Sequence, residues 1–213
     1  MLKIVRQFGM YDNLPPRPFS SGFQRSSSTG AKMTSSESLN QQREQLPLVR
    51  TLRESPEWVE FPLRTKPGER FHFTLHCLHR PEAFLLHPLF FQRLDKSETV
   101  MVNWIGNEMC GFKGLVHGGL FGILLDDCGV ITSAANFPSH NCFTATMTIN
   151  YKRICPINQF IITRAAISKL EGRKCFIATK ILDQEEKLVA EATALYLEPK
   201  DSKNLVKIVQ DKM

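Results

Sequence analysis

The sequence has no hydrophobic run long enough to cross a membrane. Its 213 residues are 42% hydrophobic. The longest strongly apolar run, around Leu120 to Leu125, is nevertheless short, whereas a membrane-spanning helix needs about 20 such residues. The length and apolar content suffice for one domain with a core, and are too small for two large domains. We therefore expect one folded domain without a transmembrane helix.

The cysteines include no pair separated by two residues, which argues against a zinc ribbon. Scattered cysteines are typical of reduced thiols in an intracellular compartment. The spacing of His72, His76 and His79 around Cys77 has some metal-like character, but these side chains would not share one face of an alternating strand. We expect no metal and no cofactor. The six cysteines are Cys77, Cys110, Cys128, Cys142, Cys155 and Cys175.

Acidic residues are almost absent from the first 35 positions. That stretch has five basic residues and one acidic residue, and the net charge of the whole chain is +6. The remainder is nearly neutral and shows no basic helix with interleaved aromatics, so no nucleic-acid partner is expected. A basic, serine-rich, acid-poor start is typical of a mitochondrial transit peptide. A disordered tail has the same composition and remains an alternative.

The chain divides into four segments by composition. Residues 1–36 form the targeting or disordered leader, in which Arg17 to Ser21 resembles a site cut by the matrix processing protease. Residues 37–85 are helical and irregular: Pro56 is expected to end a helix, and the alternation of Phe71 to Leu78 indicates a strand. Residues 86–199 form the main domain, and residues 200–213 a polar tail. The predicted location is mitochondrial, in the matrix.

The main domain has a clear α+β pattern. Leu120 to Ala135 is apolar almost all round, so this helix must be buried. Turn signals separate strand-like runs on both sides of it. One buried helix followed by a meander of long strands predicts an antiparallel sheet wrapped around that helix. The predicted strands are Thr99 to Ile105, Cys142 to Arg153, Gln159 to Leu170, Lys174 to Leu182 and Leu188 to Leu197.

A stripe on the buried helix is the main candidate for chemistry. Gly119, Gly122, Asp126 and Gly129 share one face, although each interior glycine costs about 1 kcal/mol relative to alanine. Glycine stripes usually permit close packing, but packing does not explain a carboxylate in a buried seam. We interpret Asp126 as a general base that activates water, and we expect Gly122 to lie against the substrate.

The start of the helix is a candidate oxyanion site. Backbone N–H groups at Gly118 and Gly119 are expected to be free, with the helix dipole behind them, so they suit developing negative charge. On the following strand, Thr144 is close enough to the strand's start to reach a water held by Asp126. Thr146 and Thr148 fit an ordinary solvent-facing surface. Together these groups predict hydrolysis of an acyl derivative.

Two further sets of residues have simpler interpretations. Cys128 has no histidine base beside it, so we interpret it as a buried thiol. Four basic residues lie at strand ends and turns, where they are usually solubilising, although phosphates of coenzyme A would suit them too. They are Lys152, Arg153, Arg173 and Lys174.

The motifs resemble those of the PaaI-type hotdog thioesterases, most of all the eukaryotic mitochondrial members of fungal type. The resemblance rests on Gly114 to Gly119, on Asp126 nine residues after His117, and on the run from Thr144 to Arg153 with Pro156 behind it. Glu171 to Lys174 adds to it, and the similarity extends over about Phe90 to Leu197.

The resemblance implies a hotdog domain over residues 86–199 that pairs with a second copy, as a homodimer or tetramer. It implies hydrolysis of acyl-CoA to free acid and CoA without metal. Asp126 takes the position of the catalytic acid, Thr144 that of the water-orienting hydroxyl, and His117 that of the loop histidine. Gly118 and Gly119 take the oxyanion-loop positions. An asparagine that many relatives have before the histidine is missing from Cys110 to Lys113.

Two alternatives use the same scaffold. A hotdog hydratase pairs its aspartate with a histidine five residues later, and Ile131 at that position argues against it. A non-catalytic regulator or acyl-CoA-binding protein has no need for Asp126 and Thr144, yet fold alone does not exclude it. Because Gly119 and Asp126 lie about 10 Å apart along the helix, we expect the active site to be shared between two subunits.

Overall fold

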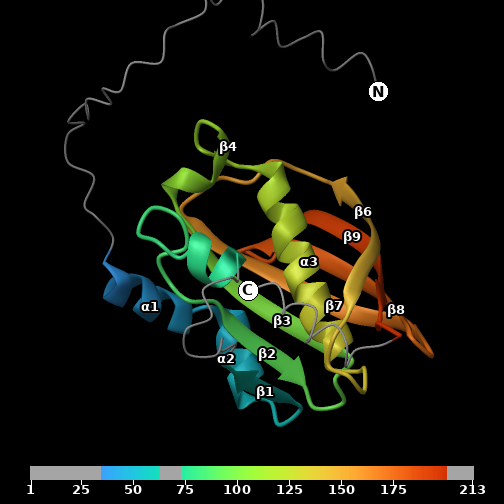
Figure 1. Ribbon diagram of the computed structural model, residues 1–213. Helices are drawn as coiled ribbons and strands as arrows, with labels where there is room; N and C mark the ends of the chain where they lie inside the picture. Colours follow the sequence, from blue (N-terminus) through green and yellow to red (C-terminus); the bar gives the residue numbers. More distant parts are fainter. Residues whose placement is uncertain (1–34, 63–72, 201–213) are drawn as a thin grey trace, which may run out of the picture. The chain divides into compact units, whose positions relative to one another are not determined.

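The computed structural model describes residues 35–62 and 73–200. The predicted leader cleavage region and most of the leader and polar tail lie outside the described residues, as does His72. Figure 1 shows the order of the elements along the chain. No described helix is long and apolar enough to cross a membrane.

Seven antiparallel strands form the main sheet, in the order β1-β2-β3-β7-β8-β9-β6. Short strands β4 and β5 form a separate hairpin. The α+β prediction is confirmed. The strands are β1 (Trp58–Phe61), β2 (Leu89–Arg93), β3 (Glu98–Ile105), β4 (Cys110–Phe112), β5 (Leu115–Val116), β6 (Phe143–Tyr151), β7 (Gln159–Glu171), β8 (Lys174–Asp183) and β9 (Leu188–Leu197).

Helix α3 (Gly118–Ala134) lies across one face of this sheet (Figure 1). It contacts β3, β6, β7, β8 and β9, and its apolar residues Leu124 and Leu125 are fully buried. The buried helix expected from an all-round apolar sequence is thus confirmed. The chain turns after the helix at Asn136, whose side-chain Nδ2 donates to the carbonyl of Thr132.

Helices α1 (Ser36–Glu44) and α2 (Pro47–Glu54) pack on the opposite face of the sheet. Side chains alternate across a strand, so Met101 in β3 packs towards α3, while its neighbours Val100 and Val102 pack with Leu52 of α2. The helical prediction for this segment is confirmed, and α2 ends before Pro56 as expected. The break at Pro47, the first residue of α2, was not predicted.

The predicted strand from Phe71 to Leu78 is wrong for the described residues. Phe73–Cys77 form a π-helical turn, in which the Leu78 N–H donates to the Phe73 carbonyl five residues back. Neighbouring residues Thr74 and Leu75 are both buried, so burial does not alternate. Strands β1 and β2 pair directly with each other. Leu75 is therefore buried by packing without a strand partner, while Phe73 at the start of the turn is exposed.

The strand β6 ends earlier than the sequence predicts. It stops at Tyr151, because the N–H groups of Lys152 and Arg153 both donate to the carbonyl of Val189. Two donors on one acceptor cannot continue a regular ladder. β6 is also the edge of the sheet, paired on one side with β9, and most of its residues are exposed.

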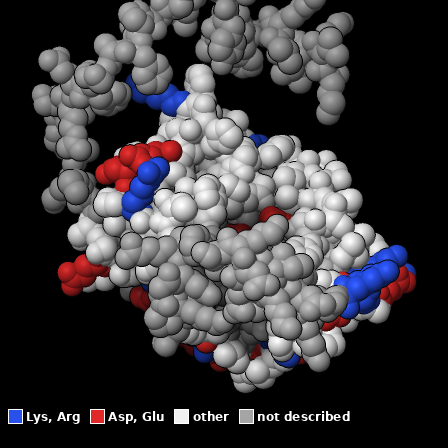
Figure 2. All heavy atoms as spheres, in the orientation of Figure 1, with Lys and Arg blue, Asp and Glu red and all other residues white. Residues whose placement is uncertain are grey.

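Charged side chains gather in small groups of both signs at the margins of the face drawn in Figure 2. The ion pairs include Lys169 with Glu171 and Lys152 with Glu191. These cations are therefore partly neutralised by the acids beside them.

Candidate active site

The side chains of Asp126 and Thr144 meet between α3 and β6. The Thr144 hydroxyl donates to Asp126 Oδ1 over 2.7 Å, a normal length for a hydroxyl bonded to a charged carboxylate. Asp126 is half-buried and Thr144 is exposed. The structure thus brings together the two residues that the sequence proposed as base and water-orienting hydroxyl.

A β-bulge directs Thr144 towards the helix. Thr144 pairs with Tyr196 and Thr146 pairs with Leu195, so Ala145 has no partner of its own on β9. In an unbroken strand Thr144 would share the face of Thr146 and Thr148, both of which are exposed. The extra residue turns Thr144 to the other face. This bulge explains why only the first threonine reaches Asp126.

Tyr196 of β9 is a site residue that the sequence analysis missed. It is fully buried, and its hydroxyl lies 3.2 Å from Asp126 Oδ1 and 3.4 Å from the Asp126 carbonyl. Burial, followed by the nearby Asp126 carboxylate, raises the pKa of Tyr196 far above its ordinary value. The hydroxyl is therefore protonated and remains a donor. A tyrosine in an apolar strand gives no sequence signal for this contact.

His117 is the N-cap of α3, and its Nδ1 accepts a hydrogen bond of 2.9 Å from the Gly119 N–H. The expectation that Gly119 has a free N–H is therefore wrong. No acceptor for the Gly118 N–H is found among the described residues. Because Nδ1 accepts, the neutral ring must carry its proton on Nε2. Gly118 N–H and His117 Nε2–H are thus the two donors that face outward at the helix start.

Tyr151 fixes the first turn of the helix. Its hydroxyl donates to the Gly118 carbonyl over 3.0 Å. A Cβ placed at Gly118 would make ordinary van der Waals contact with the Tyr151 ring. This residue was known from the sequence only as part of a family motif. The structure shows that it connects the end of β6 to the start of α3.

The glycines of the stripe make room for three different side chains. A Cβ at Gly119 would lie 2.9 Å from His117 Nδ1, and one at Gly129 would lie 2.2 Å from the Tyr196 hydroxyl. Both positions are too close for any other residue without displacement. A Cβ at Gly122 would lie 3.4 Å from Cδ1 of Ile149, so this glycine packs against β6. Its contact supports the packing interpretation that the sequence analysis had set beside substrate binding.

A cavity of about 520 Å³ opens beside His117 and Gly118, within the size range of small-molecule sites. The end of β6 lines it with Tyr151, Lys152 and Arg153. Both cations already have partners: Lys152 Nζ lies 2.8 Å from Glu191, and Arg153 Nη2 lies 2.6 Å from Asp183. The cavity is therefore flanked by positive charges that are partly neutralised.

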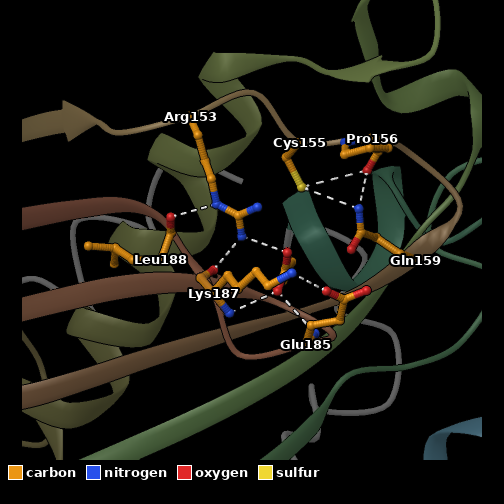
Figure 3. Close-up of polar contacts among 8 residues, drawn as sticks. Arg153, Cys155, Pro156, Gln159, Glu185, Lys187 and Leu188 are labelled. Atoms are coloured by element: carbon orange, nitrogen blue, oxygen red, sulfur yellow. Dashed lines mark hydrogen bonds and ion pairs between the residues drawn. The ribbon is translucent and has the colours of Figure 1, made fainter.

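Figure 3 shows the guanidinium of Arg153 among backbone carbonyls and acidic groups. Nε donates to the Leu188 carbonyl and Nη2 to the Lys187 carbonyl, both over 2.8 Å. Asp183 also accepts from the backbone N–H groups of Glu185 and Lys187. Burial opposes the charge, but these bonds and Arg153 lower the pKa of Asp183 overall. Arg153 thus stabilises the β8–β9 turn.

The four candidate basic residues do not come together within one chain. Lys174 is in register with Leu197, which also faces Phe143 at the start of β6. Lys152 follows the opposite end of this strand, and eight residues of strand span about 26 Å. Arg173 donates from Nη1 to the Glu198 carbonyl over 2.7 Å. Arg173 and Lys174 are therefore far from the cavity beside His117.

Neither a reactive cysteine nor a metal site is indicated among the described residues. Cys128 is fully buried, and burial raises the pKa of its thiol far above the usual range. All six cysteines lie in the described ranges and are free. No cluster of histidine, cysteine and carboxylate side chains in the described ranges has the arrangement of a metal site.

Comparisons with known proteins agree with the motifs. Residues 113–190 match the family model described as the thioesterase superfamily. The chain is 31% identical over 112 residues to acyl-coenzyme A thioesterase THEM4 of Mus musculus, covering 52% of the chain and 47% of that relative. It thus spans about half of that relative's length. It is 24% identical to a protein of Candida albicans named as uncharacterized and mitochondrial, with 58% of each chain covered.

Among solved structures, the chain is similar to a phenylacetic acid degradation-related protein of Ralstonia eutropha. The TM-score is 0.46 at 23% identity, with 49% of the chain and 79% of that structure covered. The family match confirms the resemblance that the motifs indicated, and the antiparallel sheet around α3 is the predicted hotdog arrangement.

Proposed function

On the premise that residues 113–190 carry a thioesterase-superfamily domain, we propose that this protein hydrolyses acyl-CoA to a free acid and CoA. The observation that supports this most is the 2.7 Å contact between Thr144 and Asp126, on the same helix whose start carries the Gly118 N–H donor. A carboxylate paired with a hydroxyl provides the base and the alignment that water attack requires.

In the proposed reaction Asp126 accepts a proton from a water molecule as the water oxygen attacks the thioester carbon. A tetrahedral oxyanion forms, and the bond from carbon to sulfur then breaks. The acyl group leaves as the carboxylic acid, and the sulfur of CoA takes the proton. No oxidant, metal or cofactor is needed for the balance of this step.

The oxyanion is stabilised by the Gly118 N–H and the Nε2–H of His117. A preorganised donor of this type is worth roughly 10²- to 10³-fold in rate. The asparagine of many relatives is absent, and Gly111 instead packs on the His117 ring, where a Cβ would lie 2.9 Å from Cδ2. This packing fixes the ring, so the histidine takes over part of the asparagine's role.

The active site is proposed to be completed by a second copy of the chain, in a homodimer or a tetramer. Asp126 is two helical turns from Gly118 within the continuous helix α3, about 12 Å along the axis. The exposed edge strand β6 offers unpaired backbone groups to a partner. A two-fold axis beside α3 would place the helix start of one subunit near Asp126 of the other.

Mixing two inactive variants tests the shared site. Asp126→Asn removes the base, and Gly118→Pro removes the backbone donor. In a mixed dimer one site combines both intact halves, so we expect a quarter to a half of the activity to return. Proven mixed dimers without any recovery would show that each site is built within one subunit.

Lys152 at the mouth of the cavity is proposed to meet the phosphates of CoA, since its ammonium is a mobile point charge. Arg173 and Lys174 can contribute only from a second subunit, because they lie at the other end of β6. Arg153 contributes mainly by holding the turn that supports this cavity.

A mitochondrial location is proposed from the composition of the first 36 residues, and a relative in Candida albicans is named as mitochondrial. A fluorescent fusion of the full chain is expected in mitochondria, and one that lacks residues 1–35 in the cytosol. An unchanged location of the shortened fusion would contradict this proposal.

The activity is tested by release of free thiol from a panel of acyl-CoA substrates. Turnover that saturates with substrate is expected, and Asp126→Asn sets the background. Binding of acyl-CoA with thiol release no faster than this background would instead support the acyl-CoA-binding alternative.

A further inference from the structure

Gly129 is the last glycine of the stripe on α3. A Cβ there would lie 2.2 Å from the Tyr196 hydroxyl and 2.6 Å from the ring carbon that carries it. Tyr196 is fully buried, so its ring has no open space to move into. The helix therefore has a glycine at this position because a tyrosine hydroxyl from β9 must reach past it to Asp126.

Two hydroxyls then meet on a single oxygen of one carboxylate. Thr144 donates to Asp126 Oδ1 over 2.7 Å, and the Tyr196 hydroxyl lies 3.2 Å from the same oxygen. The second distance is long for a bond between two oxygens, and the Tyr196 hydroxyl is shared with the Asp126 carbonyl. No described residue is found to donate to Oδ2.

We propose that Tyr196 is a positioning residue which, together with Thr144, holds Asp126 so that Oδ2 is the oxygen that accepts the proton of water. This inference rests on the proposed hydrolysis. The Thr144 hydrogen points to Asp126, so its oxygen faces the water as an acceptor. One water hydrogen then goes to Oδ2 and the other to Thr144, which leaves a lone pair of the water oxygen directed at the thioester carbon.

The two hydroxyls also act as hydrogen-bond donors to one carboxylate. Hydrogen bonds to a carboxylate favour its charged form, and the raised pKa of Tyr196 means that the tyrosine remains a donor throughout the working pH range. A phenylalanine at this position would fill the same space and supply no donor. The chemistry of the proposed site thus extends to β9, through the contact of Tyr196 with Asp126.

Tyr196→Phe tests this role. We expect kcat to fall about five- to tenfold, the loss of one long charge-assisted hydrogen bond, with KM unchanged. The acid limb of the pH–rate profile should move to higher pH, a shift that loose packing alone would not produce. The control is Thr179→Val, which removes another buried hydroxyl from the neighbouring strand β8 and should leave both kinetic constants and the profile unchanged.

A second measurement needs no turnover. The carboxyl carbon of Asp126 can be followed by NMR across the pH range in the wild type and in Tyr196→Phe. We expect its titration to move to higher pH in the variant. Identical titrations and identical profiles would overturn the positioning role, whereas a shifted titration in a protein without thioesterase activity would leave it standing and refute only the proposed function.

A second cavity, of about 360 Å³, lies next to His117 on its other side. Its walls are mainly apolar, and the π-helical turn supplies part of them. The lining residues include Phe73, Leu78, Met109, Leu120 and Ile123. His117 lines this apolar cavity and also the cavity flanked by Lys152. A carbonyl held by His117 therefore lies between a basic cavity and an apolar one.

We further propose that the apolar cavity takes the acyl group, and that the segment before the family-matched region sets its length. This inference also rests on the proposed hydrolysis. The charged part of CoA suits the side of Lys152, so the acyl chain is directed to the opposite side. Glu108 at the lining pairs with Arg80. A mainly apolar lining whose one acid is already paired disfavours acyl groups that end in a carboxylate, so the expected class is uncharged aliphatic or aromatic acyl.

Leu78→Trp tests the acyl cavity by filling it from the π-helical turn. We expect kcat/KM for long acyl chains to fall at least tenfold relative to the shortest chain, since added bulk excludes methylene groups worth a few-fold each. Leu94→Trp is the matched control, because Leu94 is 64% exposed. Phe73→Ala is a second variant at an exposed position, and it should shift preference towards bulkier acyl groups.

An unchanged chain-length profile in both cavity variants would overturn the acyl assignment. Displacement of a fluorescent fatty acid gives a readout without turnover. We expect weaker binding in Leu78→Trp than in Leu94→Trp. Turnover of the shortest acyl-CoA reports the proposed function by itself, so the two failures are distinguishable.

Discussion

Two helical layers cover the same sheet, and they differ in what they bury. On one face, α1 and α2 bury apolar side chains such as Leu39, Val49 and Leu52 against the sheet. On the other face, α3 buries leucines along one side and presents glycines and a carboxylate along another. The layer of α1 and α2 therefore has the composition expected of a structural support. Helix α3 instead has glycine, a poor helix former, at positions where side chains from β6 and β9 approach it.

This difference separates the helices that contribute mainly to stability from the helix that carries the proposed catalytic residues. A glycine or a half-buried acid in a helix costs free energy, and α3 accepts this cost at Gly129 and Asp126. The described helices α1 and α2 contain no glycine, and their partly buried acid Glu44 is paired with Arg53. Changes in α3 should therefore alter turnover more than stability, and changes in α2 should do the reverse.

Asp126→Asn is expected to give the largest effect. The substitution keeps the volume and removes the base, so turnover should fall about 10³-fold, within the usual range for a general base. The melting temperature should change by only a few degrees. Thiol release and thermal unfolding are measured on the same sample. Near-wild-type turnover would show that Asp126 is not the base.

Leu52→Ala in α2 is expected to produce the opposite pattern. Leu52 is 4% exposed, and truncation of a buried leucine costs about 2–5 kcal/mol of unfolding free energy. Turnover at a temperature where the variant is folded should stay at the wild-type value. Denaturant unfolding and thiol release check the pair of outcomes. A large loss of turnover in the folded variant would break the contrast between the two layers.

Thr144→Ala is expected to reduce turnover about tenfold, less than the loss of the base, because the hydroxyl orients water and does not accept its proton. Thr146→Ala is the matched control on the same strand, since the bulge turns that threonine away from Asp126. An equal or larger loss than in Asp126→Asn would mean that the two roles are reversed.

Asp183→Asn sharpens the comparison at the turn that supports the basic cavity. It should cost about 1–2 kcal/mol of stability at neutral pH through lost charge-assisted bonds. The pKa of Asp183 is lowered in the folded protein, so its stabilisation is complete above the unfolded value, about pH 4, and is lost as pH falls through the folded value. The variant should therefore have a lower free energy of unfolding than the wild type at pH 7, and this difference should be smaller at pH 3. A deficit that does not depend on pH would contradict this.

Much of the sheet and the central helix follow from the sequence. The apolar periodicity of α3 and the turn signals around Gly172 locate elements whose burial is nearly complete, so pattern and packing agree. Asp126 stood out because a carboxylate is rare in a buried stripe. The sequence predicted that Thr144 reaches a water held by Asp126, and the structure instead shows a direct hydrogen bond between the two side chains.

The features that the sequence did not predict depend on long-range pairing. The bulge at Ala145 is a property of the register with β9, and nothing in the β6 sequence signals it. Tyr196 is 70 positions from Asp126, so no local pattern connects them. The π-helical turn arises where the adjacent residues Thr74 and Leu75 are both buried by tertiary packing, which overrides local alternation. His117 accepts a hydrogen bond from the Gly119 N–H because of the geometry of the helix cap. The residue types alone do not predict that geometry.

Cys77 in the π-helical turn is an exposed thiol, while the thiols of Cys128, Cys155 and Cys175 are buried. An alkylating reagent reaches a surface sulfur far faster than one in the core, so mild labelling should favour this position. A fluorophore attached there would lie on the turn that also carries Phe73 and Leu78. Its emission would then report, in real time, whether the neighbouring cavity is empty or filled.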